Sequence, residues 1–373
     1  MQLSDESNPE ELNSIMESII QRIATGPDLS KDIEMDEARL GMKALLDEAI
    51  DPVRSAIFLI ALRMKRETPE ENRGILQAIL DHTERVRANV DEIIDIADPY
   101  DGYNRTIPAS PFLAPILAEF GLNAVSHGLD VVGPKYGITH RHVLQAAGMN
   151  VDLSPSEAVK KIEDENIGWA YIDQAQFAPK LHDLIDLRGR MIKRSVITTV
   201  EVLAKPVVGR KKTHFITGYV HKPYPPVYAD LARLAGFDTA VLVRGVEGGI
   251  IPSLRQAGRY FAYHDLGQEE VNEISPADFS IDQKIRCVPI PEDVPQTAKG
   301  EGAIKITNIE AGAKRAAEFG LAALGGEKGA TYDSLVYSGA IILKHLNKVD
   351  SFNQGSDAIR SILDSGKAVK RIC

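Results

Sequence analysis

Positive charge is concentrated between Leu187 and Lys222, where nine Lys or Arg side chains accompany a single acid, Glu201. The whole chain carries a formal net charge of −10, so this segment reverses the sign locally. Clustered like charges repel one another unless solvent or an anion neutralises them. The segment therefore predicts an anionic partner, either a phosphorylated small molecule or a nucleic-acid backbone, with a solvated basic face as the alternative. Its cations are Arg188, Arg190, Lys193, Arg194, Lys205, Arg210, Lys211, Lys212 and Lys222.

Two segments upstream have the composition of phosphate-binding loops. The turn Tyr100–Arg105 follows a strand-like run, the place where open α/β sheets bind ligands. His127-Gly128 ends another such run, and Lys135 precedes a helix. Backbone N–H groups beside a cation suit an anion, whereas a plain Asp-Gly turn and a strand-end histidine are the simpler readings. The candidate phosphate-binding residues are Asp101, Gly102, Asn104, Arg105, His127, Gly128 and Lys135.

A third loop, Arg244–Gly249, follows the continuous β-branched run Thr239–Val243 and carries one acid, Glu247. Magnesium held between protein and a diphosphate usually takes one or two carboxylates, completed by water and phosphate oxygens. Glu247 is therefore a candidate Mg²⁺ ligand, although no neighbouring acid supplies a second carboxylate. Taken by itself, a solvated loop acid is the simpler interpretation.

The elements that must position these residues change character near residue 90. Before it, helices follow in series, including a very apolar one that Asp51-Pro52 begins. A helix that is apolar on several sides is usually buried, so packing against a second subunit is expected. From about Glu92, short strands alternate with helices, which predicts α/β architecture. The chain ends in helices, and we expect Ser356 to cap the last one.

Bulk composition sets the remaining bounds. With 373 residues, 44% hydrophobic and 26% charged, the chain has the make-up of a globular protein of two domains, or of one domain with a large insertion. The first residues have neither the basic nor the apolar region of a signal peptide, and no apolar run reaches the length of a membrane span. Only Cys287 and Cys373 are present, which favours a reducing cytoplasm over a disulfide framework.

Taken in order, these segments resemble the anthranilate phosphoribosyltransferase family over nearly the whole chain. The matching parts include Leu62–Lys65 with Glu67–Glu71, the loop Tyr100–Arg105, Leu144–Gly148 with Val151–Pro155, Ile167–Ala170, Arg188–Arg194 and Gly325–Gly329. The resemblance implies an α/β fold in which a small all-helical domain joins a large α/β domain with a central, mostly parallel sheet. It also implies a homodimer, and phosphoribosyl transfer from a diphosphate donor to an aromatic amine, with Mg²⁺, in a cleft between the domains. The expected divisions are 1–90 with about 179–206 (helical, dimerisation), and about 91–178 with 207–373 (α/β).

Departures from the family pattern lie in the donor-binding motifs. The glycine-rich donor loop is here Asp98–Gly102, where proline removes an N–H group and aspartate repels phosphate. The motif Lys-His-Gly-Asn-Arg is Ser126–Asp130, without the lysine, asparagine and arginine. The acidic magnesium pair falls at or near Gly248-Gly249, leaving Glu247 alone. The chain therefore looks like a member of a divergent phosphoribosyltransferase-like branch that includes nucleic-acid binders.

Two functions of different classes follow. The first is a glycosyltransferase-family protein that binds a phosphorylated ribose donor or another polyanion, with anthranilate activity in tryptophan biosynthesis doubtful because the donor motifs are eroded. Each lost electrostatic donor is worth about 2.7–4 kcal/mol of transition-state stabilisation. The second is a non-catalytic protein that binds single-stranded nucleic acid along Arg188–Lys222, with the nearby tyrosines stacking bases.

The basic run offers a direct test of the second function. Replacing Arg210, Lys211 and Lys212 together by alanine is expected to weaken nucleic-acid binding and to leave a small-molecule site unchanged. Anisotropy titrations with a single-stranded oligonucleotide at two salt concentrations measure this, because phosphate contacts make affinity depend on salt. Unchanged affinity in the triple variant identifies the run as a solvated face.

Overall fold

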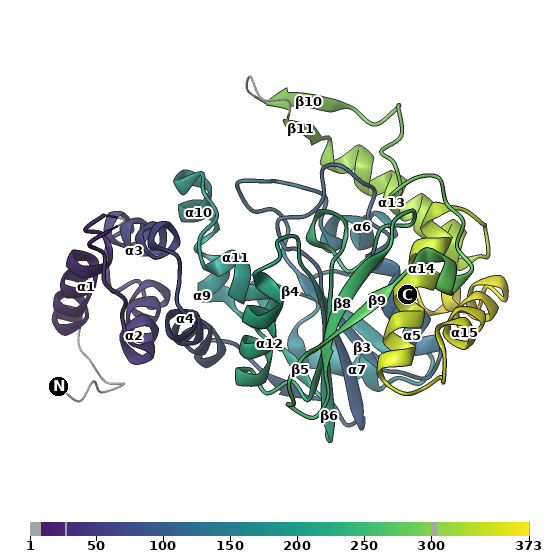
Figure 1. The fold of residues 1–373 in the computed structure, drawn as a ribbon, viewed down its shortest axis with the longest axis horizontal. Helices are drawn as coiled ribbons and strands as arrows, with labels where there is room; N and C mark the ends of the chain where they lie inside the picture. Colours follow the sequence, from purple (N-terminus) through teal and green to yellow (C-terminus); the bar gives the residue numbers. More distant parts are fainter. Residues whose placement is uncertain (1–8, 27, 300–303, 373) are drawn as a thin grey trace.

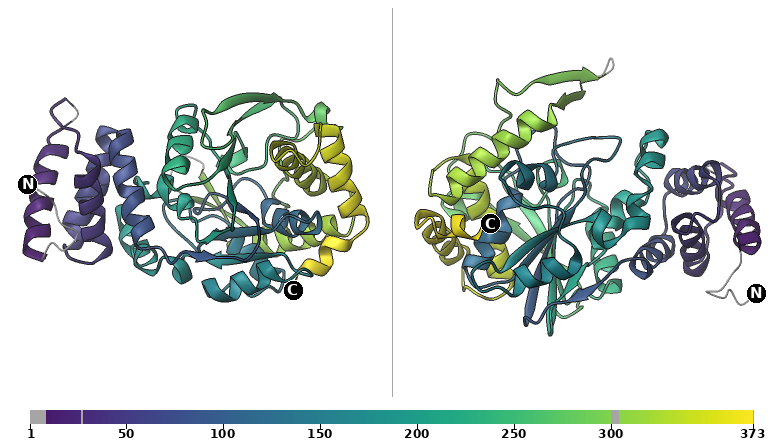
Figure 2. Two further views of the ribbon diagram at one scale, coloured as in Figure 1. Left: turned by 90° about the horizontal axis from the view of Figure 1, so that it is seen from below. Right: turned by 180° about the vertical axis from the view of Figure 1, so that it is seen from behind.

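The computed structural model describes residues 9–26, 28–299 and 304–372. Four helices come first and stand together beside the rest of the molecule (Figures 1 and 2). Asp51 caps the third helix by accepting from the N–H groups of Val53 and Arg54, and Thr68 caps the fourth in a capping box. These helices are α1 (Pro9–Ile23), α2 (Met35–Leu46), α3 (Pro52–Lys65) and α4 (Pro69–Asp81).

The large part is built on one seven-stranded sheet in the order β4-β3-β2-β6-β7-β8-β9. The first five strands in that order are parallel, and β8 and β9 pair antiparallel at one edge. The small helical part and the mostly parallel sheet confirm the predicted fold class. The strands are β2 (Glu92–Ala97), β3 (Ala124–Gly128), β4 (Trp169–Asp173), β6 (Lys212–Gly218), β7 (Thr239–Val243), β8 (Gly258–Tyr263) and β9 (Glu270–Ile274).

Alternate residues of the central strands face two separate apolar clusters. In β7, Ala240 and Leu242 belong to the cluster that continues into the helical part, whereas Val241 and Val243 belong to the cluster on the other face. Helices therefore cover both faces, as the figures show (Figures 1 and 2). They are α5 (Leu113–Glu119), α6 (His140–Ala146), α7 (Pro155–Glu163), α12 (Tyr224–Leu234), α13 (Ile309–Leu324), α14 (Ala330–His345) and α15 (Phe352–Asp364).

Between β4 and β6 the chain leaves the sheet and forms four short helices, the last two of which pack on α3 and α4. The return passes through β5 (Val207–Val208), which pairs in parallel with β1 (Val86–Arg87). A two-stranded hairpin, β10 (Gln296–Lys299) with β11 (Ile304–Thr307), projects from the body near α13 (Figure 1). The short helices are α8 (Gln174–Phe177), α9 (Pro179–His182), α10 (Ile185–Met191) and α11 (Ile197–Val200).

Two expectations are corrected. The segment Lys212–Gly218, interpreted from its charge as part of a basic stretch, is a strand at the centre of the sheet, and all but its first residue are buried. The cations beside this segment suggest an exposed stretch, but the segment itself contains the β-branched and aromatic residues of a buried strand. Ser351, rather than Ser356, caps α15 by accepting from the N–H of Gln354, and Ser356 lies buried inside the helix. Of the helices in the described ranges, none combines the length and apolar character needed to cross a bilayer.

Candidate functional site at the carboxyl edge of the sheet

Asp98 joins the loops that follow β2, β3 and β7. Because these strands are parallel, their carboxyl ends meet at one edge of the sheet. The Asp98 carboxylate accepts from Tyr103 Oη at 2.6 Å, from the N–H of Ile250 at 2.9 Å and from Ser110 Oγ, and His140 Nε2 lies 2.9 Å away. Burial alone would raise the pKa of Asp98, but these hydrogen bonds and the charge of His140 outweigh it and hold the pKa below its usual value.

Ser126, His140 and Asp98 form an acid–histidine–serine chain, since Ser126 Oγ lies 2.7 Å from His140 Nδ1. In a nucleophilic triad the serine oxygen must be open to substrate. Here the serine and the histidine are 1% and 4% exposed, respectively. The chain therefore ties α6 to the sheet and does not form a hydrolytic site.

The backbone of the turn Tyr100–Arg105, called the phosphate loop from here on, binds a carboxylate of the protein itself. The N–H of Asn104 lies 3.1 and 3.2 Å from the two Glu247 carboxylate oxygens, and the N–H of Arg105 lies 2.5 Å from one of them. Lys135 Nζ lies 3.0 Å from the same carboxylate. Glu247 holds this position with a positive φ of 54°, a conformation that costs a non-glycine residue energy. The N–H groups and cation expected to hold phosphate are thus bound to Glu247.

Asp101 makes a second charge pair across the site. Its carboxylate accepts from Arg194 Nε at 2.9 Å and Nη2 at 2.5 Å, and Lys135 Nζ lies 3.9 Å away. Arg194 comes from the segment between α10 and α11, so this pair links the phosphate loop to the short helices that pack on the small helical part. Asn104 is structural, because its side chain donates to the carbonyl of Lys135 and accepts from the N–H of Thr307.

His127 lies inside the sheet, and its ring does not reach the loop surface. Its Nε2 is 2.7 Å from Asp95 Oδ1, its Nδ1 is hydrogen-bonded to Tyr100 Oη, and Phe177 packs on its edge. Burial, followed by nearby acids such as Glu201 and Asp95, raises the pKa of Tyr100 well above its usual value, so this hydroxyl stays protonated. Of the predicted phosphate residues, the structure therefore brings Asp101, Asn104, Arg105 and Lys135 together around Glu247 and leaves the His127 side chain behind them.

Comparison with known proteins agrees with this architecture. Residues 17–83 match the family model described as the glycosyl transferase family, helical bundle domain. A protein of Aquifex aeolicus (strain VF5), described as uncharacterized, is 29% identical over 238 residues, covering 64% of this chain and 71% of that protein. Anthranilate phosphoribosyltransferase of Petrotoga mobilis is 26% identical over 355 residues, covering 95% of this chain and 94% of the enzyme.

A solved structure extends the likeness to three dimensions. Anthranilate phosphoribosyltransferase from Saccharomyces cerevisiae in complex with PRPP and Mg superposes with a TM-score of 0.73 at 16% identity, over 98% of this chain and 96% of that chain. At this identity the superposition shows the shared fold. The helical-bundle match and a relative similar over nearly the full length support the anthranilate phosphoribosyltransferase family for this chain.

In the described part of the chain, the loops at this edge offer a divalent cation no free pair of carboxylates. Glu247 is bonded to two N–H groups and faces Lys135. A side chain at position 249 has no room, because a Cβ there would lie 1.7 Å from Tyr103 Oη. Within the described ranges, no three His, Cys, Asp or Glu side chains come together as metal ligands. The residues present therefore do not fit Mg²⁺.

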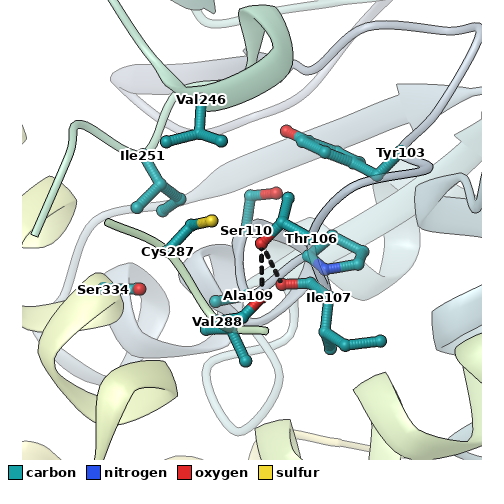
Figure 3. A pocket seen from close by; sticks show the side chains of 11 residues that line it. Tyr103, Thr106, Ile107, Ala109, Ser110, Val246, Ile251, Cys287, Val288 and Ser334 are labelled. Carbon is teal, nitrogen blue, oxygen red and sulfur yellow. Dashed lines mark hydrogen bonds between the residues drawn. The ribbon is translucent and has the colours of Figure 1, made fainter. Parts of the chain in front are cut away.

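Side chains also fill the space below the loop. A cavity of about 20 Å³ lies among Tyr103, Val246, Ile251 and Cys287, and the segment 106–110 before α5 forms one of its walls (Figure 3). A cavity of this size has room for about one water molecule. A phosphorylated sugar in this position requires the β7 loop, which carries Glu247, to move.

The cations of the basic stretch Arg188–Lys222 do not lie on one continuous surface. Arg188 is buried, and its guanidinium donates to both Glu201 oxygens at 2.7 Å. Lys205 is also buried, which lowers its pKa to about 8. Arg190 is exposed and pairs with Asp186, and Lys193 is exposed. Arg210 and Lys211 pair with Asp91, and Lys212 pairs with Asp265, at the amino end of β6, opposite the phosphate loop.

The sequence analysis did not identify Asp98 as the centre of the site. It also did not identify Tyr103 as the side chain that leaves no room for a side chain at position 249. An acid directly after a buried strand was the available signal for Asp98. Nothing local signals that Tyr103 packs against Gly249, because the two residues approach only through the fold.

We predict that Arg188→Ala lowers the free energy of unfolding by about 3–5 kcal/mol, because it leaves the buried Glu201 carboxylate without its charged partner. Urea denaturation followed by circular dichroism measures the loss. Arg188→Met with Glu201→Leu is the matched control, and it should recover most of the stability because no buried charge remains. A single variant as stable as the wild type contradicts the role given to this pair.

Proposed function

We propose that the chain binds the phosphate groups of a phosphorylated ribose donor, or of a similar polyanion, at the phosphate loop, in competition with its own Glu247. The position of the Glu247 carboxylate carries this proposal. Carboxylate and phosphate oxygens both accept hydrogen bonds from N–H and ammonium groups. The binding of the Glu247 carboxylate therefore indicates that the phosphate loop can also bind a phosphate group. The yeast family member solved with PRPP and Mg supports a ribose donor as the external anion.

Competition also explains why efficient transfer to anthranilate is not expected. A donor must displace an intramolecular carboxylate that is always present, and Asp101 adds a second negative charge to the loop. The second carboxylate that would hold Mg²⁺ beside the diphosphate is excluded by Tyr103. We therefore place the chain in a divergent branch of the family, with weak or absent anthranilate activity and a cytoplasmic location. The division into residues 1–90 with about 179–206, and the remainder, stays part of this proposal.

Nucleic-acid binding along Arg188–Lys222 is the less favoured function. The segment contains two buried cations, Arg188 and Lys205, and a central strand of the sheet. Its exposed cations are divided between the neighbourhood of α10 and the amino end of β6. A continuous backbone of phosphates requires a continuous track of positive charge, which this arrangement does not provide.

We predict that Glu247→Gly increases affinity for 5-phosphoribosyl diphosphate at least tenfold. The change frees two N–H groups and Lys135, and it relieves the positive φ. Glu247→Gln should give a smaller increase, because the amide oxygen still accepts but carries no charge. Isothermal titration calorimetry with and without Mg²⁺ measures both variants.

Glu273→Gln is the matched control, because it removes a carboxylate from the exposed face of β9. Its affinity should equal that of the wild type. Conversion of anthranilate, assayed in parallel, should stay far below that of an active family enzyme. The competition is refuted if both Glu247 variants fold and bind the donor no more tightly than the wild type.

We also propose a homodimer formed through α3. This helix leaves Val53, Ile57 and Met64 exposed at 68%, 40% and 75%, at spacings that place them along one side of the helix. Apolar side chains gathered on an exposed face indicate an interaction surface. The exposed face agrees with the packing expected from the apolar sequence of this segment.

Val53→Lys with Met64→Lys is predicted to convert the dimer into a monomer, because two buried charges at an apolar interface are not compensated. Size-exclusion chromatography with light scattering gives the mass. Leu29→Lys, which changes an equally exposed leucine in the loop before α2, is the control and should leave the mass unchanged. A wild-type chain that is monomeric at micromolar concentration contradicts the proposal.

A further inference from the structure

An open hollow lies beside the phosphate loop and is separate from the Glu247 contacts. Its volume is about 610 Å³, within the range of small-molecule sites. Three segments far apart in sequence line it: the end of the phosphate loop, the turn before β8, and the strap that leads to β10. Because the fold brings them together, no local pattern in the sequence indicates this site.

The lining contains four cations and no acid. They are Arg105, Arg255, Lys284 and Arg286, and all four are exposed. Among the described residues, none of the three arginines pairs with a carboxylate, whereas Lys284 pairs with Asp282 at 2.7 Å. In a chain with a net charge of −10, acids to neutralise such a group are abundant elsewhere. Uncompensated repulsion concentrated in one hollow indicates an external anion.

The type of cation indicates which anion. Guanidinium groups present paired N–H donors that match phosphate oxygens, and several of them around one hollow suit several adjacent phosphates better than one. The wall between Lys284 and Arg286 is apolar, because Ile285 is 40% exposed there and Pro289 and Ile290 continue it. A flat or apolar group attached to the phosphates has a surface to pack against.

We propose that this hollow binds an organic polyphosphate of the nucleoside triphosphate class, with the phosphates on Arg105, Arg255 and Arg286 and the base against Ile285. The site lies next to the phosphate loop through Asn104 and Arg105, yet it needs no movement of Glu247. The hollow is therefore open in the conformation in which Glu247 occupies the N–H groups of the phosphate loop. A single inorganic phosphate uses only part of the charge and none of the apolar wall.

Calorimetric titration of the full chain, in EDTA and at low salt, tests the proposal with three probes: ATP, inorganic tripolyphosphate and orthophosphate. ATP should bind most tightly, tripolyphosphate less tightly because it lacks the base, and orthophosphate at least tenfold more weakly than tripolyphosphate. Arg255→Ala with Arg286→Ala should weaken ATP at least tenfold. Ile285→Ser should weaken ATP and leave tripolyphosphate unchanged.

Arg210→Ala with Lys211→Ala is the matched control, because it also removes two exposed cations but at the opposite edge of the sheet. Its ATP affinity should equal that of the wild type. No ATP binding at millimolar concentration, or an equal loss in the control, overturns the proposal. So does tight binding of oligothymidylate that strengthens with length and is lost in Arg255→Ala with Arg286→Ala, which assigns the hollow to nucleic acid.

The outcome is independent of the proposed donor function. Glu247→Gly should raise the affinity for the ribose donor, whereas Arg255→Ala with Arg286→Ala should weaken ATP and leave the donor affinity unchanged. Failure of either pair of results therefore identifies which of the two sites is wrong.

Discussion

The loops at the carboxyl edge of the sheet depend on one buried carboxylate. Asp98 accepts hydrogen bonds from Tyr103 and Ser110 after β2 and from Ile250 after β7, and it contacts His140 of α6. A buried charge is tolerated only when its oxygens are satisfied, so each of these groups is held in place by the requirements of Asp98. Loops that are mobile in many α/β proteins are here tied to a common point.

That constraint determines what the site can bind. Tyr103, positioned by Asp98, fills the space beside Gly249 and prevents a second acid there. The same loop geometry aims the N–H groups of Asn104 and Arg105 at Glu247. The chain thus has the fold of the yeast anthranilate phosphoribosyltransferase, while the backbone N–H groups of its phosphate loop are bonded to Glu247. Positive charge left without a carboxylate lies outside this network, in the hollow between Arg105 and Arg286.

The sequence was most informative where structure is local. The caps at Asp51 and Thr68 and the run Thr239–Val243 needed only neighbouring residues, and the structure has them as expected. It was least informative where charge and burial conflict. The charge around Lys212–Gly218 predicts an exposed basic segment, yet the residues after Lys212 are buried in the central strand of the sheet. Charge at the end of a strand stays in solvent while the rest is buried, so composition alone misplaces such segments.

By itself, the sequence determined the elements and the fold class and indicated the family, because each of these depends on adjacent residues or short motifs. Only the tertiary structure decided which charges are available. Glu247 and Asn104 are 143 residues apart, and their contact turns a candidate metal ligand into an internal anion. In the same way, the sequence suggests that Arg188 is a surface cation, whereas the structure shows it buried and paired with Glu201. Electrostatic interactions depend on distance and burial in space, and neither quantity can be read from the order of residues along the chain.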